Sequence, residues 1–236
     1  MKTIIGILGG MGPRATVAFE QLLLDRLPGS DQDLPTIFTI NDGSIPDRSK
    51  YLLDAGPDPL PRMIRNAQVL ENAGSTFICV PCNTACAPEI FDRLRCSVNI
   101  PVLSLIEEVG HYVCSTTNGP CYVLATEGTI RVRSFQNMLE QNNIRAITPP
   151  RAIQATIDAL IRAIKQNDTL TINILSVCVK TAIQKSGCQT VILGCTELPL
   201  IKNLLVPTDI VAVDTLEVLA AACVRYTKAY TEEMKV

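Results

Sequence analysis

The sequence predicts an α/β protein made of two similar halves, each containing a parallel sheet flanked by helices. Short apolar runs rich in β-branched residues alternate along the chain with longer segments of helical periodicity, a pattern typical of parallel sheets. In each half, one such run leads into a turn that carries a cysteine. These two residues, Cys82 and Cys195, lie 113 positions apart in a chain of 236 residues.

Other landmarks repeat at almost the same offset. Aligning Gly12 with Gly128 also aligns Phe19 with Phe135, at an offset of 116 residues. A repeat of roughly 115 residues indicates an internal duplication, which predicts two pseudo-symmetric domains. Because ligands of open α/β sheets bind at the carboxyl ends of the strands, we expect one active site in the cleft between the two domains.

In the first half, short apolar runs predict strands at 3–8, 37–40, 77–80 and 101–105. Helices are predicted where apolar residues recur every three or four positions. The first begins at Pro13, a residue that suits the first turn of a helix, and another covers 61–73. The glycine-rich turn 9–12 and the loop 41–48, which is dense in turn-forming residues, connect these elements.

The pattern restarts at Cys121. The same criteria predict strands at 122–124, 144–148, 191–193 and 210–213, and helices at 130–139, 151–165, 169–185 and 216–230. Residues 126–129 form the predicted turn that corresponds to the glycine turn of the first half. We place the first domain at 1–100, with the C-terminal helix 214–236 packing back on it, and the second domain at 101–213.

Composition limits the kind of protein. With 47% hydrophobic and 19% charged residues, the chain can bury a substantial core, and no apolar run is long enough to span a membrane. The formal net charge of −2, without a basic stripe, argues against nucleic acid as a partner. The apolar run near the N-terminus is short and lacks a small-residue cleavage site. We therefore interpret it as a strand and expect a cytoplasmic protein.

Ten cysteines in a chain of this size do not suggest a disulfide framework, which is typical of small secreted domains. In a reducing compartment most of them are expected to be small buried apolar residues. This interpretation applies to Cys96, Cys114, Cys121, Cys178, Cys188 and Cys223.

Two motifs are compatible with other functions. The glycine turn at 10–15 resembles a relaxed dinucleotide fingerprint, but the acidic residues that could bind a ribose precede the second strand instead of ending it. Cys79, Cys82 and Cys86 have the spacing of a redox or metal motif, but Cys79 lies inside the apolar strand and a fourth ligand is not apparent nearby. We therefore expect a tight turn and a core thiol at these positions.

The pair of thiols is the stronger chemical signal. A thiol on each side of one carbon suits removal of a proton from one face and delivery to the other. Cysteine titrates near ~8.5 and can be tuned lower, and the turns supply hydroxyls at Thr84 and Thr196 and backbone donors for developing charge. An acidic substrate also requires cations, for which Arg48 and Lys165 are candidates. Ordinary surface charge is the alternative for both.

Five segments resemble the aspartate/glutamate racemase family, and most closely its aspartate racemase branch: GILGGMGPRAT at 6–16, NDGSIPDR at 41–48, PCNTA at 81–85, LATEGT at 124–129 and GCTELPL at 194–200. They occur in order and cover nearly the whole chain. The resemblance implies racemisation by two catalytic cysteines, Cys82 and Cys195, without pyridoxal phosphate, metal or any other cofactor. It also implies two pseudo-symmetric α/β domains and a homodimer.

The resemblance further implies which residues bind the substrate. Asn83, Thr84 and Thr196 match positions that contact the α-amino and α-carboxylate groups of the substrate. Arg48 and Lys165 match positions that hold the side-chain carboxylate in the aspartate branch. The remaining substrate-binding candidates lie in the matched loops: Met11, Thr126, Thr129 and Glu197.

One position departs from the family pattern. The first motif usually reads PCNTAH, whereas Cys86 occupies the sixth position here. A neutral thiol is a weaker hydrogen-bond donor than an imidazole, so we expect the rate, and with it the substrate preference, to differ from those of relatives that carry the histidine.

The sequence as a whole favours an isomerase, an amino-acid racemase that interconverts L- and D-aspartate or the glutamate enantiomers. Its expected partner is a small acidic amino acid. We expect it to bind neither nucleic acid nor a membrane. Alternatives from the same superfamily are a hydantoin racemase, a maleate isomerase and a catalytically weak homologue that binds an acidic amino acid. A redox or metal-binding protein is the remaining alternative.

Overall fold

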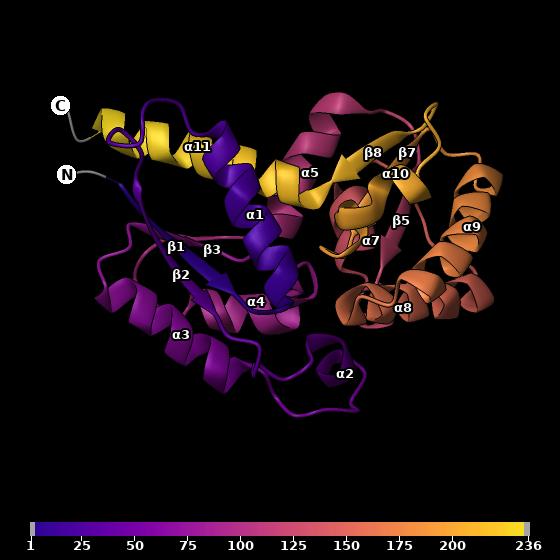
Figure 1. Ribbon diagram of the computed structural model, residues 1–236, viewed down its shortest axis with the longest axis horizontal. Coiled ribbons are helices and arrows are strands. Elements are labelled where there is room, and N and C mark those ends of the chain that lie inside the picture. Colours follow the sequence, from indigo (N-terminus) through magenta and orange to yellow (C-terminus); the bar gives the residue numbers. More distant parts are fainter. Residues whose placement is uncertain (1–2, 234–236) are drawn as a thin grey trace.

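The computed structural model describes residues 3–233 and contains two four-stranded parallel sheets (Figure 1). The strand order is β2-β1-β3-β4 in the first sheet and β6-β5-β7-β8 in the second. The two orders are the same when the strands of each half are counted from its start. This repetition confirms the predicted α/β architecture of two similar halves.

The strands lie close to their predicted positions. They are β1 (Ile4–Gly9), β2 (Thr36–Asn41), β3 (Phe77–Cys79), β4 (Val102–Leu103), β5 (Cys121–Ala125), β6 (Ala146–Ile147), β7 (Thr190–Gly194) and β8 (Val211–Asp214). The strand predicted at 101–105 is shorter than expected, because Ser104 caps a helix that begins at Leu105. Its hydroxyl accepts a hydrogen bond from the Glu107 amide at 3.3 Å.

Helices flank both sheets. Those before the second sheet are α1 (Pro13–Arg26), α2 (Arg48–Leu52), α3 (Leu60–Asn72), the 3₁₀ helix η1 (Thr84–Cys86), α4 (Pro88–Arg95) and α5 (Leu105–Thr116). Those that follow are α6 (Glu127–Arg131), α7 (Ser134–Gln141), α8 (Arg151–Gln166), α9 (Thr169–Lys185), the 3₁₀ helix η2 (Leu198–Ile201), α10 (Lys202–Leu205) and α11 (Thr215–Glu233). None of these described helices is long and apolar enough to cross a lipid bilayer.

The single helix predicted at 130–139 is wrong, because the chain forms two helices there. Arg133 lies between α6 and α7 with a positive φ of 57°, a conformation that ends the first helix. The carbonyl of Ile130 accepts hydrogen bonds from the Arg133 amide at 3.1 Å and from Gln136 Nε2 at 3.0 Å. The break keeps α6 short and leaves its N-terminal turn beside the first half.

The C-terminal helix α11 returns from the second sheet and packs against α1 and α5 (Figure 1). The last three positions of the predicted helix 214–236, and the first two of the predicted domain 1–100, lie outside the described residues. Because α11 begins directly after β8 and reaches α1, it connects the two halves on one side of the molecule.

All ten cysteines are free thiols. Cys121, Cys188 and Cys223 are buried, as expected for small apolar residues. The same expectation is wrong for the other three of that group, which are exposed on helices or at a helix end: Cys96, Cys114 and Cys178. The apolar periodicity of a helix does not by itself place a cysteine on its inner face.

The glycine turn after β1 is tight and packs against the loop after β2. Gly10 has a φ of 92°, and a Cβ atom at this position would lie 2.3 Å from the backbone of Asp42. The Thr16 hydroxyl fixes the turn by accepting from the Gly10 amide at 2.9 Å and donating to the Gly12 carbonyl at 3.0 Å. This geometry places the start of α1 next to the segment that leads into α2.

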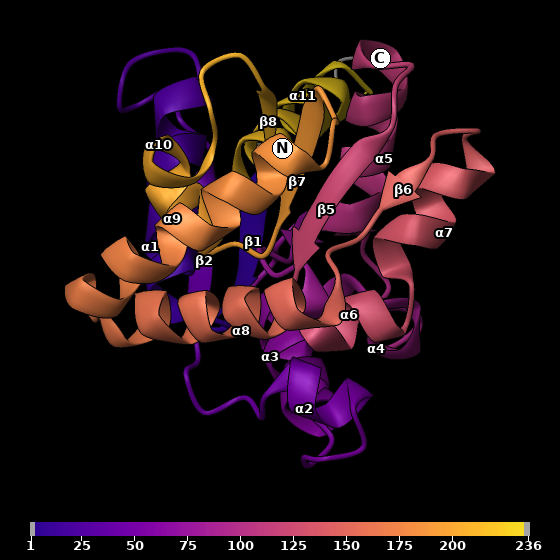
Figure 2. The ribbon, with the colours of Figure 1, turned by 90° about the vertical axis from the view of Figure 1, so that its right-hand side faces the viewer.

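The carboxyl ends of the strands face the cleft between the halves. Figure 2 shows β5 pointing towards α6 and α8, with α2 on the far side of α6. Contacts between α2 and α6 bring the first half against the second at this end of the sheets. The turns that carry Cys82 and Cys195 follow β3 and β7, the equivalent strands of the two sheets.

Candidate active site

The two cysteine-bearing turns meet at one pocket between the halves. The first half contributes Met11, Asp47, Arg48, Ser49, Cys82, Asn83 and Thr84, and the second contributes Thr126, Lys165, Cys195, Thr196 and Glu197. The free volume of the pocket is about 20 Å³, which is about the space that one water molecule needs. The side chains of the pocket itself therefore fill most of it in this conformation.

Cys82 is almost fully buried at the start of the turn after β3. Its thiol donates a hydrogen bond of 3.4 Å to the main-chain carbonyl of Met11. The same carbonyl accepts from Arg48 Nη2 at 2.8 Å. The glycine turn thus positions the first thiol through a backbone oxygen, a group that accepts hydrogen bonds but does not take up a proton near neutral pH.

Cys195 has a different environment. Its Sγ lies 2.9 Å from Glu197 Oε2, and the other carboxylate oxygen lies 3.7 Å from Lys165 Nζ on α8. Burial raises the pKa of the Cys195 thiol well above its usual value, Glu197 adds to the rise, and Lys165 opposes it. For Lys165 itself, burial is the largest single effect and lowers the pKa, but Glu197, Cys195 and Cys82 together outweigh it and the net shift is upward.

Asn83 has one satisfied and one unsatisfied polar atom. Its Nδ2 donates to the Thr215 hydroxyl at 3.1 Å, and that hydroxyl donates to the Leu193 carbonyl at 3.1 Å. These two hydrogen bonds fix the orientation of the Asn83 amide. Its Oδ1 is buried and has no hydrogen-bond partner. A buried acceptor without a partner is costly in a folded protein, so its position in a pocket suggests a ligand that donates to it.

Arg48 is buried at the start of α2 and holds three main-chain carbonyls. Its Nη1 donates to Ile45 at 3.2 Å and to Pro46 at 2.8 Å, and its Nη2 donates to Met11. The Nε–H is buried without a partner. Arg48 therefore shapes the loop before α2 and also keeps a donor available for an anionic ligand.

Three threonine hydroxyls form a closed ring across the cleft. The oxygens of Thr84 and Thr126 lie 3.2 Å apart, those of Thr126 and Thr129 lie 3.0 Å apart, and Thr129 donates to Thr84 at 3.0 Å. Thr126 also caps α6 by accepting from the Thr129 amide. Because Thr84 belongs to the first half and the other two to the second, this ring links the halves at the pocket.

Two contacts beside the pocket also connect the first half to the second. The Gly128 amide donates to Ser49 Oγ at 3.1 Å, which joins α6 to α2. Farther out, Arg131 Nη2 pairs with Asp54 Oδ2 at 3.0 Å on the exposed surface. These contacts hold α2 against the second half.

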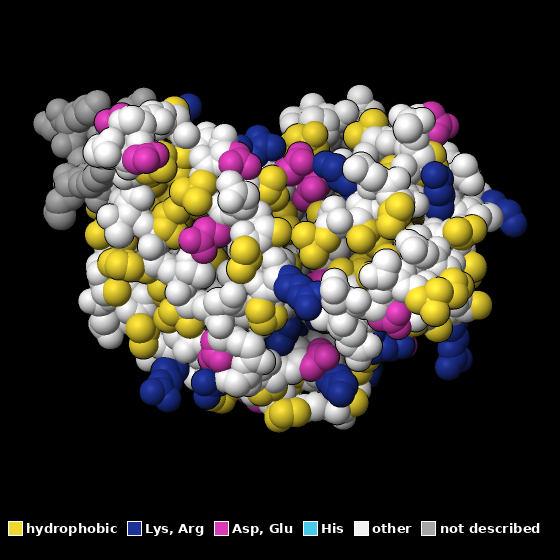
Figure 3. Space-filling model, viewed as in Figure 1, with side chains coloured by type: hydrophobic (Ala, Val, Ile, Leu, Met, Phe, Trp, Pro, Cys, Tyr) yellow, Lys and Arg dark blue, Asp and Glu magenta, His cyan; other side chains and the backbone are white. Residues whose placement is uncertain are grey.

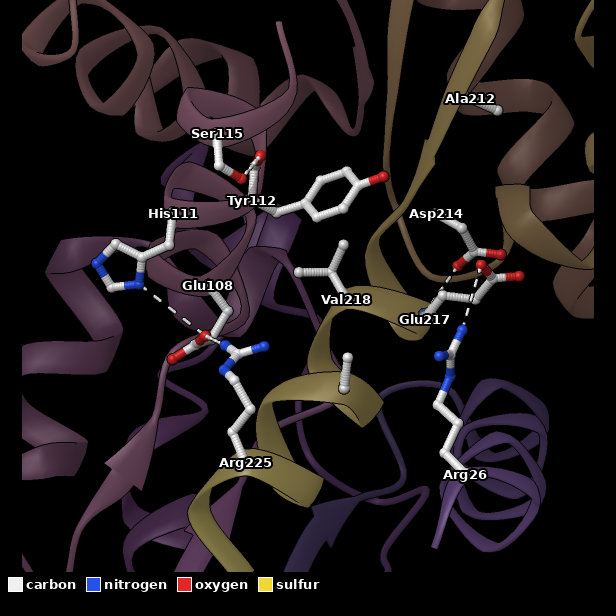
Figure 4. A pocket seen from close by; sticks show the side chains of 11 residues that line it. Arg26, Glu108, His111, Tyr112, Ser115, Ala212, Asp214, Glu217, Val218 and Arg225 are labelled. Carbon is white, nitrogen blue, oxygen red and sulfur yellow. Dashed lines mark hydrogen bonds and ion pairs between the residues drawn. The ribbon is translucent and has the colours of Figure 1, made fainter. Parts of the chain in front are cut away.

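A larger pocket of the described structure lies elsewhere. A cavity of about 590 Å³ opens between α5, α11 and β8, and its ion pairs include Glu108 with Arg225 at 2.6 Å and Arg26 with Glu217 at 3.6 Å (Figure 4). Charged side chains of both signs also gather along the hollow between the two lobes in Figure 3. No cysteine and no unpartnered buried polar atom lines this cavity, so its size does not make it the chemical site.

The pocket brings together ten of the eleven residues predicted from the sequence. The exception is Thr129, which lies behind the lining and contacts it through the hydroxyl ring. Sequence reasoning missed Asp47, Ser49 and Thr215. Asp47 belongs to the IPDR segment and caps α2 by accepting from the Ser49 amide at 2.8 Å, a role that its position before a helix could have indicated.

The three-cysteine motif does not form a cluster. Cys79 donates to the Gly6 carbonyl inside the first sheet, whereas Cys82 lines the pocket. Cys86 is buried behind it and accepts from the Leu105 amide at 3.4 Å. In the part of the chain that the structure describes, no group of three or more histidine, cysteine, aspartate or glutamate side chains is arranged to hold a metal ion.

Residues 8–223 match the family model described as Asp/Glu/hydantoin racemase. The chain belongs to this family. The match includes both cysteine-bearing turns and every residue of the pocket. This family membership confirms the resemblance seen in the sequence motifs.

Individual relatives agree on the fold. The solved structure of the Picrophilus torridus aspartate racemase is 27% identical and superimposes with a TM-score of 0.83, covering 96% of this chain and 94% of that one. A Francisella tularensis glutamate racemase solved with D-glutamate has a TM-score of 0.72 at 18% identity, covering 98% of this chain and 82% of that one. At that identity the similarity concerns the fold alone.

Sequence relatives include two kinds of racemase. The broad-specificity amino-acid racemase RacX of Bacillus subtilis (strain 168) is 30% identical over 69% of this chain and 71% of its own length. A Pseudomonas putida (strain W619) glutamate racemase is 29% identical over 65% of this chain. The matched region spans 58% of the length of that glutamate racemase.

Proposed function

We propose that this protein is a cofactor-independent amino-acid racemase that interconverts L- and D-aspartate, with glutamate as the second candidate substrate. The observation that carries the proposal is the pair of thiols. Cys82 and Cys195 come from equivalent turns of the two halves and line one pocket. A substrate carbon held between them would have a proton acceptor on one face and a proton donor on the other.

The unpartnered polar atoms support an amino acid as the substrate. Asn83 Oδ1 is an acceptor and Arg48 Nε–H a donor, and both are buried without partners at this pocket. An amino acid carries an ammonium group and a carboxylate, which are complementary to these two atoms. The threonine ring adds hydroxyls that can donate to a carboxylate once they are released from one another.

Cations at the pocket support an acidic side chain. Lys165 faces the pocket from α8, and Arg48 faces it from α2. Both are already engaged, Lys165 by Glu197 and Arg48 by three carbonyls. A substrate carboxylate therefore has to compete for them, and the broad-specificity relative makes neutral amino acids a necessary part of any assay.

The proposed mechanism uses the groups of the chain itself. One cysteine, as the thiolate, removes the proton from Cα, and the other, as the thiol, delivers a proton to the opposite face. The bonding electrons stay on the substrate as a carbanion whose charge spreads onto the α-carboxylate. Hydroxyls of Thr84 and Thr126, which line the pocket, and the amides of the turns would stabilise that charge, and a closed pocket would exclude water.

The decisive experiment is incubation with each enantiomer of aspartate, glutamate and a set of neutral amino acids in deuterated water. Chiral chromatography and mass spectrometry then measure inversion and deuterium incorporation together. We expect the antipode to appear with one deuterium at Cα. No inversion of aspartate or glutamate would refute the proposed substrates, and no inversion of any of the amino acids would refute the proposed activity. A Cys82→Ser, Cys195→Ser double variant supplies the background rate.

A further inference from the structure

Glu197 gives the thiol of Cys195 a hydrogen-bond partner that the thiol of Cys82 lacks. Its carboxylate is almost fully buried, with one oxygen on Cys195 Sγ at 2.9 Å and the other on Lys165 Nζ at 3.7 Å. The side chain also fills the space beside the glycine turn, because a Cβ atom added to Gly12 would lie 2.9 Å from Glu197 Oε1. The carboxylate is thus held in one place by contacts from both halves.

The thiol of Cys82 bonds to a main-chain carbonyl and not to a carboxylate. The hydrogen bond described for its thiol goes to the Met11 carbonyl, which cannot take up the proton. A carboxylate beside Cys195 can accept a hydrogen bond from the thiol and repels the thiolate. The two positions that the fold makes equivalent therefore differ in how strongly they hold a proton.

We propose that Glu197 is a positioning residue that holds Cys195 as the protonated thiol, so that the resting enzyme carries the acid on Cys195 and the base on Cys82. This inference rests on the proposed racemase function and adds to it the identity of the resting acid. Burial and Glu197 both raise the pKa of Cys195, in agreement with the geometry. The titratable and charged groups that face this thiol across the pocket are Glu197 on its own turn, Lys165 on α8, Asp47 and Arg48 at α2, and Cys82.

The proton balance of one turnover follows from this arrangement. Cys82 thiolate takes the Cα proton and becomes a thiol, and Cys195 gives its proton to the opposite face of the carbanion. The enzyme is left with a Cys195 thiolate next to the Glu197 carboxylate, two negative charges of which only one can pair with Lys165. Exchange with water returns a proton to Cys195 and removes one from Cys82, which restores the resting form.

Racemisation rates alone cannot reveal this asymmetry. The equilibrium constant between enantiomers is one, so kcat/KM must be the same in both directions. An irreversible reaction of each thiol on its own avoids this constraint. Elimination from β-chloroalanine is suitable, because removal of the Cα proton expels chloride and the resulting aminoacrylate hydrolyses to pyruvate and ammonia.

The test uses two backgrounds, Cys82→Ser, in which only Cys195 can act as the base, and Cys195→Ser, in which only Cys82 can. Pyruvate release from both β-chloroalanine enantiomers is measured against pH, with and without Glu197→Gln. Glutamine keeps the shape of the side chain against Gly12 but removes its charge. We expect Glu197→Gln to move the Cys195-driven profile to lower pH by about one unit or more and to leave the pH dependence of the Cys82-driven profile in place. Glu127→Gln, at an exposed carboxyl on α6, is the matched control.

A second readout separates this inference from the proposed function. Alkylation of the full-length protein by iodoacetamide, followed by peptide mass spectrometry, reports the thiolate fraction of each cysteine without any catalysis. We expect Cys82 to react at lower pH than Cys195, and Glu197→Gln to narrow that difference by lowering the pH at which Cys195 reacts. An unchanged Cys195 profile in Glu197→Gln, or equal shifts at both cysteines, would overturn the role of Glu197. Absence of elimination and racemisation with an intact alkylation difference would overturn only the racemase function.

Discussion

Asn83 and Thr215, which are 132 residues apart in the chain, share a hydrogen bond of 3.1 Å at the base of the pocket. Nδ2 of Asn83 donates to the Thr215 hydroxyl, and that hydroxyl donates a hydrogen bond to the Leu193 carbonyl. This relay leaves Oδ1 of Asn83 without a partner. The start of α11 thereby orients an amide that belongs to the turn carrying Cys82.

Replacement of Thr215 by valine removes the acceptor of that hydrogen bond while keeping the shape of the side chain. We expect the buried Asn83 amide to lose both its partner and its fixed orientation. The free energy of unfolding, measured with urea, should fall by about 1–3 kcal/mol. The KM for the amino acid should rise while the pH profile of kcat stays in place. Thr215→Ser keeps the hydroxyl and should behave like the parent protein. An unchanged KM in Thr215→Val would show that Asn83 Oδ1 does not bind the substrate.

Gly128 is required where α6 meets α2. A Cβ atom at this position would lie 2.6 Å from Ser49 Oγ and 2.8 Å from Ser49 Cα. Gly128→Ala should therefore push α2 away from the second half and prevent full closure of the pocket. We expect kcat/KM to fall on the order of tenfold to hundredfold. Gly119→Ala is the matched control, because the nearest atom to its Cβ would be 3.9 Å away. Equal activity of the two variants would mean that this contact does not position the pocket.

Lys165 offers the cleaner test of the cationic side of the pocket. Arg48→Ala would also release the carbonyls of Ile45, Pro46 and Met11, so its effect would combine binding with folding of the loop. Lys165→Met keeps the aliphatic stem. We expect the KM for aspartate to rise roughly tenfold or more, with a much smaller change for alanine or serine. Parallel changes for acidic and neutral amino acids would remove Lys165 from recognition of the side-chain carboxylate.

Much of this arrangement is predictable from sequence, because strand runs and turn residues are local signals. The two strands before Cys82 and Cys195 and the cleft between two similar sheets follow from such signals. The direction of Glu197 does not, since the same sequence permits rotamers towards the substrate or towards the thiol. The packing of Gly12 and Lys165 decides between them. Thr215 was missed because its contact with Asn83 spans most of the chain.

Cys86 is a structural residue in this fold, and its burial has a consequence at alkaline pH. Burial raises the pKa of Cys86 to about 12 and that of Cys121 to about 11, against an ordinary value of 9.0. Above pH 9 the unfolded chain loses these protons while the folded chain keeps them. The stability attached to these thiols is thus fully present below pH 9 and is lost as the pH rises towards 12.

We therefore expect the free energy of unfolding to fall between about pH 8 and about pH 10.5 in denaturant titrations. Cys86→Ala should lower stability at every pH, since it removes a buried side chain, but should make the dependence on pH less steep. Cys96→Ala, at an exposed position, should leave the slope unchanged. A slope that is identical in Cys86→Ala and the parent protein would show that this thiol does not contribute to the alkaline loss of stability.

The two thiols themselves allow the most direct test of a two-base mechanism. A serine hydroxyl is a far weaker acid than a thiol, so Cys82→Ser and Cys195→Ser should each lower racemisation by roughly 10²-fold or more. Each variant should still bind substrate, because Asn83, Arg48 and Lys165 remain. Removal of a proton needs only one base, so each variant should retain elimination from β-chloroalanine, and the two should prefer opposite enantiomers.

Chiral chromatography and pyruvate release measure these two activities on the same preparations. Residual racemisation that is equal in the single variants and in the double variant would show that another residue is the base. Full racemisation in Cys82→Ser with none in Cys195→Ser would indicate a one-thiol mechanism, in which Thr84 or water supplies the second proton. The expected preference for opposite enantiomers follows from the two-base proposal. The turns after β3 and β7 come from different halves and line one pocket, so in that proposal each thiol would reach one face of the same carbon.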